Sequence, residues 1–264
     1  LRPGDLVTPE SLELAERRLT ATPSLALGRV RLTAPAGGRA DLVGGTAVRG
    51  AQRLSAGWLA QTGWTAVAES RLRLGAPGPA GSGEYVTFDW TFAAGRRAVG
   101  IALGTPDPLG IDGIARFHAA WAEQTFADPS GGTVRESSRR GEIGLSRWTG
   151  PRSRIQSSVG VERWNERGTD LTLHAGFEHL VGDDRGRITA EIVGGVALGG
   201  SPSYGTARLG ARWRSSDRAD VSHWAVAAGA MGVTDASPRS RWPRVGTGTS
   251  GEPLLRAHPL LVDG

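Results

Sequence analysis

Short segments in which apolar and polar residues alternate with a period of two recur along most of the chain. In residues 86–92, Val, Phe, Trp and Phe alternate with Thr, Asp and Thr, and the same alternation occupies 115–121, 171–177, 188–194 and 207–213. A period of two is typical of a strand with one apolar and one polar face. We therefore expect about ten strands between Leu54 and Val233, separated by turns rich in Gly, Pro and Asp.

The strands are predicted to form an antiparallel sheet, because no helical pattern interrupts them as a parallel arrangement requires. A soluble sandwich and a transmembrane barrel both fit this pattern. The polar face is rich in Arg, Glu, Gln and His, which could meet in a hydrated lumen. Trp also recurs near the expected strand ends, as in the interfacial girdle of a barrel, at Trp64, Trp148, Trp164, Trp213 and Trp224. These features favour the barrel, although Trp also fills sandwich cores.

The first fifty residues follow a different pattern. Thr8 is a candidate N-cap before Pro9, and apolar residues then recur every three or four positions as far as Leu19, as in a helix. Residues 26–32 and 40–48 read as two strands joined by a turn. We predict a helix followed by a hairpin over 1–50 and a partial barrel over 51–264. The Pro-, Gly- and Ser-rich stretch 235–264 is expected to be a long loop directed into the lumen.

Composition narrows the function classes. The 264 residues include no Cys, and all 31 basic residues are Arg, which excludes a disulfide framework, a thiol catalyst and lysine chemistry. No apolar run reaches the roughly 18–20 residues of a membrane-spanning helix. The net charge of +5 suggests an acidic partner such as anionic lipid, lipopolysaccharide or nucleic acid. A GC-rich genome that encodes Arg in place of Lys explains the same bias. Since the chain starts at Leu1, we also expect it to be a piece of a longer protein.

Candidate motifs for cofactors are weak. Residues 246–251 match GxGxxG but lack the preceding strand and following helix of a dinucleotide site. His174 and Glu178 share one face of a predicted strand and His179 lies on the other, which is a poor arrangement for a metal. We expect no cofactor and no metal.

Motifs for catalysis and nucleic-acid recognition are no stronger. Many serines leave a Ser-His-acid hydrolase open, but no GxSxG elbow occurs. Basic residues are spread along the chain and mixed with acids, so nucleic acid is not the expected partner. The chain is not expected to be an enzyme.

A single arginine, Arg256, lies among apolar residues in the tail segment 253–261. In a loop that folds into a barrel, this guanidinium could meet a carboxylate in the lumen and be held by paired hydrogen bonds. The alternative is a solvated side chain on a mobile loop.

The arrangement resembles the BamA and two-partner-secretion transporter superfamily, also called bacterial surface antigens. In that family periplasmic POTRA units precede an outer-membrane barrel. The helix with Arg29-Val30-Arg31-Leu32 and Asp41-Leu42-Val43 resembles the end of a POTRA unit. Leu255-Arg256-Ala257-His258 is similar to the family's [VIL]-R-G-[FY] loop element, with Ala and His in place of Gly and the aromatic residue.

The resemblance implies a function in the outer membrane of a Gram-negative cell. The chain would insert or export polypeptides, would contact lipid and lipopolysaccharide, and would need no cofactor. Its partners would be unfolded client polypeptides or periplasmic proteins. The strand edge formed by Arg29, Val30, Arg31 and Leu32 would bind client strands by β-augmentation. A passive porin-like or structural barrel and a barrel-embedded hydrolase are the alternatives.

Overall fold

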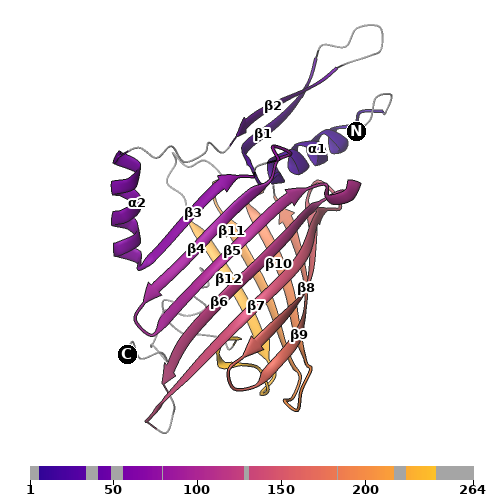
Figure 1. The fold of residues 1–264 in the computed structure, drawn as a ribbon. Helices are drawn as coiled ribbons and strands as arrows, with labels where there is room; N and C mark the ends of the chain where they lie inside the picture. Colours follow the sequence, from indigo (N-terminus) through magenta and orange to yellow (C-terminus); the bar gives the residue numbers. More distant parts are fainter. Residues whose placement is uncertain are drawn as a thin grey trace.

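A computed structural model describes residues 6–33, 41–48, 56–78, 80–127, 131–182, 184–216 and 224–241 of the protein. The fold is mainly β, with two α-helices and two antiparallel sheets of two and ten strands (Figure 1). Neither helix in the described part of the chain is long and apolar enough to cross a bilayer.

The N-terminal unit consists of helix α1 (Pro9–Ala21) followed by strands β1 (Leu25–Leu32) and β2 (Leu42–Val48). Thr8 caps the helix: its hydroxyl accepts the Ser11 N–H at 3.2 Å, and the Ser11 hydroxyl accepts the Thr8 N–H at 2.9 Å. Two otherwise unsatisfied N–H groups are thereby paired. The strands pair antiparallel, from Leu25 opposite Val48 to Leu32 opposite Leu42. The predicted helix and hairpin are confirmed.

Helix α2 (Ala56–Glu69) corrects the sequence analysis, which placed the start of the repeated strands near Leu54. Four alanines with high helix propensity lie in this segment, at positions 56, 60, 66 and 68, and they outweigh its two glycines and two threonines. Apolar residues at positions 60, 64, 67 and 68 follow helical spacing rather than alternation. Trp64 accordingly lies on a helix and not at a strand end.

The ten-stranded sheet holds most of the described residues. Its strands are β3 (Arg71–Pro77), β4 (Tyr85–Ala93), β5 (Arg96–Pro106), β6 (Ile114–Ala127), β7 (Thr133–Trp148), β8 (Ser153–Trp164), β9 (Gly168–Val181), β10 (Gly186–Ala197), β11 (Tyr204–Arg214) and β12 (Ala225–Val233). Each strand pairs antiparallel with the next one along the chain. The predicted number of strands and their antiparallel order are confirmed. Within the described residues β3 and β12 do not pair, so the sheet is open.

The two faces of the sheet differ sharply in chemistry. The apolar face is continuous across neighbouring strands, where cross-strand partners such as Ile143, Val159 and Leu173 lie side by side. These side chains are not buried: Leu173 is 50% exposed, Leu209 56% and Ile192 63%. No second sheet covers the apolar face among the residues that the structure describes, so the dry interior of a sandwich is not observed there.

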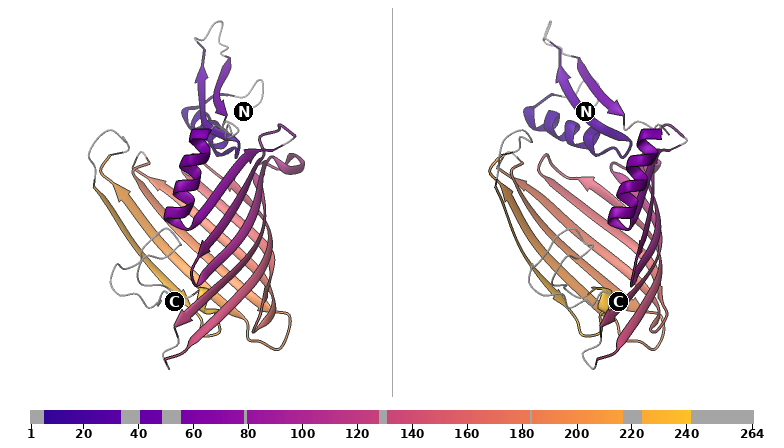
Figure 2. Two further views of the ribbon diagram at one scale, coloured as in Figure 1. Left: turned by 60° about the vertical axis from the view of Figure 1, so that its left-hand side comes forward. Right: turned by 90° about the vertical axis from the view of Figure 1, so that its left-hand side faces the viewer.

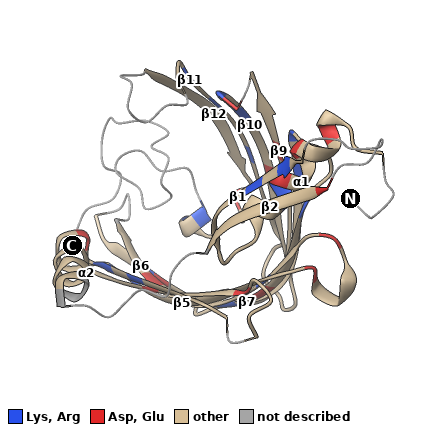
Figure 3. Ribbon diagram, turned by 90° about the horizontal axis from the view of Figure 1, so that it is seen from above, with Lys and Arg blue, Asp and Glu red and all other residues tan. Residues whose placement is uncertain are grey.

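The sheet bends into a trough, with β5–β7 along one wall and β9–β12 along the other (Figure 3). The short 3₁₀ turn η2 (Arg239–Arg241), drawn in yellow, lies between the two walls (Figure 2). Its residues bind Glu136 and Glu162, which both belong to the polar face. The polar face is therefore the concave face of the trough, and the apolar face is the convex one.

Helix α1 lies across one end of the trough, here called the upper end (Figure 1). Arg17 contacts Asp184 and donates from Nε to the Pro151 carbonyl at 3.1 Å, while Arg18 pairs with Asp112 at 3.1 Å. These partners lie in three different loops between strands. The contacts fix the N-terminal unit at the upper end, and the opposite end is called the lower end.

Two of the predicted girdle tryptophans point the wrong way for a girdle. Trp148 lies between the guanidinium groups of Arg17 and Arg154, 5.8 and 5.7 Å from its ring centroid, and Trp164 is buried. Both belong to the concave face, because position 148 pairs with Arg154 and position 164 with Ser138. Only Trp213 and Trp224 match the expectation: they are exposed near strand ends, with ring centroids 4.8 Å apart.

Candidate functional site

The concave face carries most of the polar side chains of the sheet, in three levels from the upper to the lower end. The alternation that exposes apolar side chains on the convex face places Arg, Glu, His and Ser on the concave face. Each level has a different charge balance.

The upper level is rich in arginine. Its members, here called the upper arginine cluster, are Arg116, Arg154, Arg187, Arg212 and Arg214. Glu178 is the one carboxylate on the described strands at this level. It lies 3.0 Å from Arg154 and 3.8 Å from Arg187. In the described parts of the upper loops, Asp184 pairs with Arg17 of α1 and Asp112 with Arg18.

The middle level is a continuous polar network that spans five neighbouring strands, β6 to β10. Arg140 lies 3.2 Å from His118 Nδ1 and 3.4 Å from Glu142. The Ser158 hydroxyl donates to Glu142 at 2.5 Å and lies 3.4 Å from His174 Nδ1, and His174 Nε2 lies 3.1 Å from Glu191. Opposite charges and hydrogen-bonding groups thus balance one another across the trough.

This network brings Ser158, His174 and Glu191 together in the order of a hydrolase triad, but its geometry does not suit catalysis. The short bond from the Ser158 hydroxyl commits its proton to Glu142 rather than to the histidine. Strand β8 is paired on both sides, so its backbone N–H groups are used within the sheet. They cannot form an oxyanion hole beside Ser158. The arrangement favours a structural polar network over a nucleophile.

A second serine–histidine contact lies on the convex side near the upper end. Ser153 Oγ is 2.9 Å from His179 Nδ1. No carboxylate contacts His179 among the residues that the structure describes, so the third member of a triad is missing there. As the sequence analysis predicts, His174 and Glu178 share the concave face and His179 lies on the other. The described residues contain no group of three or more side chains suited to hold a metal.

The lower level is a buried set of ion pairs, here called the lower lock. Glu162 is 4% exposed and accepts from Arg241 Nη2 at 2.9 Å. Glu136 accepts the backbone N–H groups of Arg239 and Ser240 at 2.9 and 3.1 Å. Three contacts on two acidic side chains therefore hold η2 against β7 and β8.

A second part of the lower lock fixes the chain just before η2. Arg167 donates to the carbonyl oxygens of Ala236 and Pro202 at 2.5 and 2.6 Å, and its Nε lies 3.2 Å from the fully buried Asp170. Its guanidinium also lies over the Tyr204 ring, 5.0 Å from the centroid. Tyr204 requires glycine opposite it, since a Cβ at Gly195 would lie 2.0 Å from the ring.

Arg241 remains charged in this setting. Burial acts to lower the pKa of its guanidinium, but the charge of Glu162, together with the hydrogen bond between the two groups, raises the pKa above its ordinary value. A permanently charged arginine on a buried carboxylate is a specific anchor. The segment from 234 to 241 is thereby held inside the trough.

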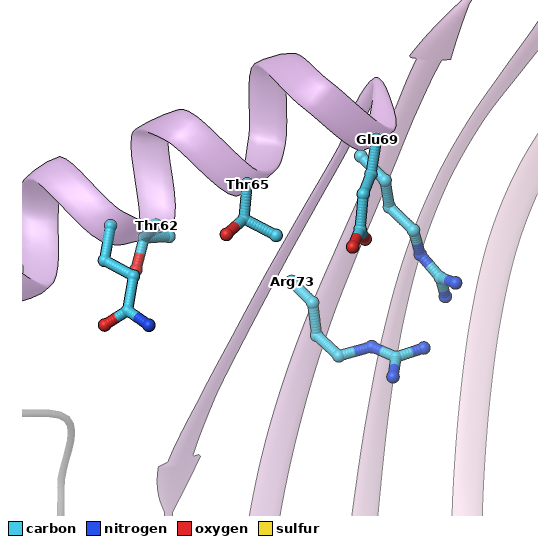
Figure 4. A pocket seen from close by; sticks show the side chains of 6 residues that line it. Thr62, Thr65, Glu69 and Arg73 are labelled. Atoms are coloured by element: carbon cyan, nitrogen blue, oxygen red, sulfur yellow. The ribbon is translucent and has the colours of Figure 1, made fainter.

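A groove of about 340 Å³ lies between α2 and the edge strand β3. Gln61, Thr62, Thr65 and Glu69 line it from the helix, and Arg71 and Arg73 line it from the strand (Figure 4). Both arginines already bind Asp89, each at 2.8 Å. The groove is therefore a polar surface whose two arginines are already paired within the protein.

Of the two sets of site residues predicted from the sequence, the structure describes one. Leu255, Arg256, Ala257 and His258 lie outside the described residues, as does the rest of the predicted lumen loop after Arg241. Arg29, Val30, Arg31 and Leu32 lie on β1, paired with positions 45 to 42 of β2. The other edge of β1 has no strand partner among the described residues, as a strand-binding edge requires. Its use by a client stays a prediction.

Within the described part of the predicted lumen loop, the arginine that meets a buried concave carboxylate is Arg241, which the sequence analysis did not single out. Its sequence signal is faint: it precedes Trp242-Pro243 at the start of the Pro- and Gly-rich tail. A comparison with protein-family models finds no match, and a search of curated proteins finds no significant match.

Proposed function

We propose that the chain forms part of the wall of an outer-membrane β-barrel. The observation that carries this proposal is the convex face, where large apolar side chains are exposed on the nine strands β4 to β12. Exposed apolar surface on this scale is unfavourable in water and suits contact with lipid.

The position of the charges on the convex face supports lipid contact. By the register, charged side chains occur only at its two borders: Arg147 and His179 near the upper end, and Arg97, Glu123, Arg135, Arg139 and Arg163 near the lower end. Between them the band is free of charge. On β10 it runs from Ile188 to Val196, about 27 Å along the strand, or about 21 Å across a bilayer at a tilt of about 40°.

The concave face would then line a water-filled passage, since its charges need water or one another. The three levels described above provide such a lining. Outer-membrane lipid and lipopolysaccharide would contact the convex band and its basic borders.

Within this class of protein, insertion or export of polypeptides is the proposed activity. The N-terminal unit lies over the upper end of the trough, and one edge of its strand β1 has no strand partner in the described part of the chain. An open edge presents a row of unpaired backbone groups to which an extended client can add as a strand. A passive porin-like or structural barrel shares the wall but has no use for this edge.

A photo-crosslinking residue at Val30, on β1, tests the proposal in the full chain inserted in membranes. We expect crosslinks to an unfolded outer-membrane polypeptide at Val30. The control position is Ile155 in the convex band, where crosslinks should go to lipid. Absence of polypeptide crosslinks at Val30, with ion conductance retained, would favour a passive channel.

A further inference from the structure

We propose that the upper arginine cluster binds acidic segments of the polypeptide that passes along the concave face. This inference rests on the function proposed above and specifies its substrate chemistry. It starts from a charge imbalance, because the described strands hold five arginines and one carboxylate at this level, and that carboxylate, Glu178, pairs with only two of the five.

The register places two of these arginines directly against each other. Arg187 is the cross-strand partner of Arg212, and like charges in that relation repel. Arg212, Arg214 and Arg116 have no carboxylate partner among the described residues. The positive charge of Arg154 also repels that of Arg116. Such repulsion is relieved when an anion binds between the guanidinium groups.

The cluster is accessible as well as charged. Arg116, Arg187 and Arg212 are exposed, and Arg214 is half-buried. They lie on the concave side of the sheet, where a hollow surface of one sign focuses the field on a passing solute. Lipid headgroups would meet the convex face instead, so the cluster is turned away from them.

The extent of the cluster points to a polypeptide and not to a small anion. Arg116 lies on β6 and Arg212 on β11, five strand spacings apart in the sheet order, or about 24 Å along the sheet. One phosphate or carboxylate cannot bridge that distance, whereas an extended segment of about seven residues can. Arginine binds carboxylates through two parallel hydrogen bonds, so a segment with several Asp or Glu residues fits best.

Binding of a labelled nine-residue peptide to the full chain in lipid nanodiscs tests the inference. The peptide alternates Glu with Ser, and the comparison peptide alternates Gln with Ser. We expect the acidic peptide to bind and the neutral one not to bind, with an affinity that falls as salt is raised. The double variant Arg187→Gln/Arg212→Gln should weaken binding at least about tenfold.

A matched control is built into the sheet. Arg139 and Arg163 are also direct cross-strand partners, but they lie on the convex face. Arg139→Gln/Arg163→Gln removes the same charge and should leave peptide binding unchanged. Equal weakening by both double variants would overturn the inference in favour of a general effect of net charge.

Two further outcomes would also overturn it. One is equal binding of the acidic and neutral peptides. The other is full competition by inorganic phosphate together with equal affinity for a three-residue acidic peptide, which would indicate a site for single anions. If either occurs while Val30 still crosslinks to polypeptide, the inference fails and the proposed function stands. Loss of membrane insertion and of crosslinks would instead remove the proposed function.

Discussion

Replacing Val159 with arginine should prevent stable insertion of the sheet into a bilayer. Val159 lies in the convex band between Ile143 and Leu173 on the neighbouring strands. Arginine on the lipid face near the bilayer midplane costs about 2–4 kcal/mol. We expect the folded fraction of Val159→Arg in vesicles to collapse at urea concentrations that the unchanged chain withstands, as measured by heat-modifiable migration on gels.

The control is Gln156→Arg on the same strand. Gln156 belongs to the concave face, where its register partners are Ser146 and Gly176. A guanidinium there meets water and other polar groups, so insertion should be close to that of the unchanged chain. Equal loss in both variants would mean that the convex face does not contact lipid.

Removing Arg241 should open the lower lock. Arg241→Ala leaves the carboxylate of Glu162, 4% exposed, without its cation, and breaking a buried pair in this way costs about 3 kcal/mol or more. This loss of stability is expected to be local to η2. We expect hydrogen exchange at the Arg239 and Ser240 amides to speed up about 100-fold, the change that about 3 kcal/mol corresponds to.

The double variant Arg241→Ala/Glu162→Gln separates charge from packing. Neutralising Glu162 removes the buried uncompensated charge, so exchange at these two amides should return part of the way toward its original rate. The amide of Val99, on β5, a strand that carries no residue of the lower lock, should exchange at the same rate in every variant. Identical exchange in the single and double variants would rule out the ion pair as the anchor of η2.

Much of the sheet was predictable because alternation is a local property. The apolar and polar positions of 171–177 lie on opposite faces, as their period requires, and the observed strand β9 extends the pattern at both ends. The cap at Thr8 is likewise set by neighbouring residues. Such features depend on residues close in sequence, so sequence alone specifies them.

Helix α2 was missed for a related reason. Ser55 precedes it in the sequence as a candidate N-cap, but the segment contains glycines and threonines that are common in strands and turns. The spacing of Ala60, Trp64 and Val67 was the other available signal for a helix. The Trp girdle was overestimated because position near a strand end does not specify the face: Trp148 and Trp164 lie on the concave side.

The lower lock could not be predicted by such patterns. Arg241 and Glu162 are separated by 79 positions, and Glu136 and Arg239 by 103. Contacts of this separation depend on how far the sheet bends and where the tail re-enters it. Arg241 meets a concave carboxylate in the described part of the chain, whereas the expectation for Arg256 concerns a residue outside it and stays a prediction.

Spin labels along β9 test most directly whether the convex face meets lipid and the concave face meets water. The chain has no cysteine, so single cysteines at positions 171 to 177 can be labelled without background. In vesicles we expect positions 171, 173, 175 and 177 to be accessible to oxygen, and positions 174 and 176 to a water-soluble nickel chelate. Uniform accessibility along the strand, or nickel access at Leu173 and oxygen access at His174, would contradict the proposed membrane wall.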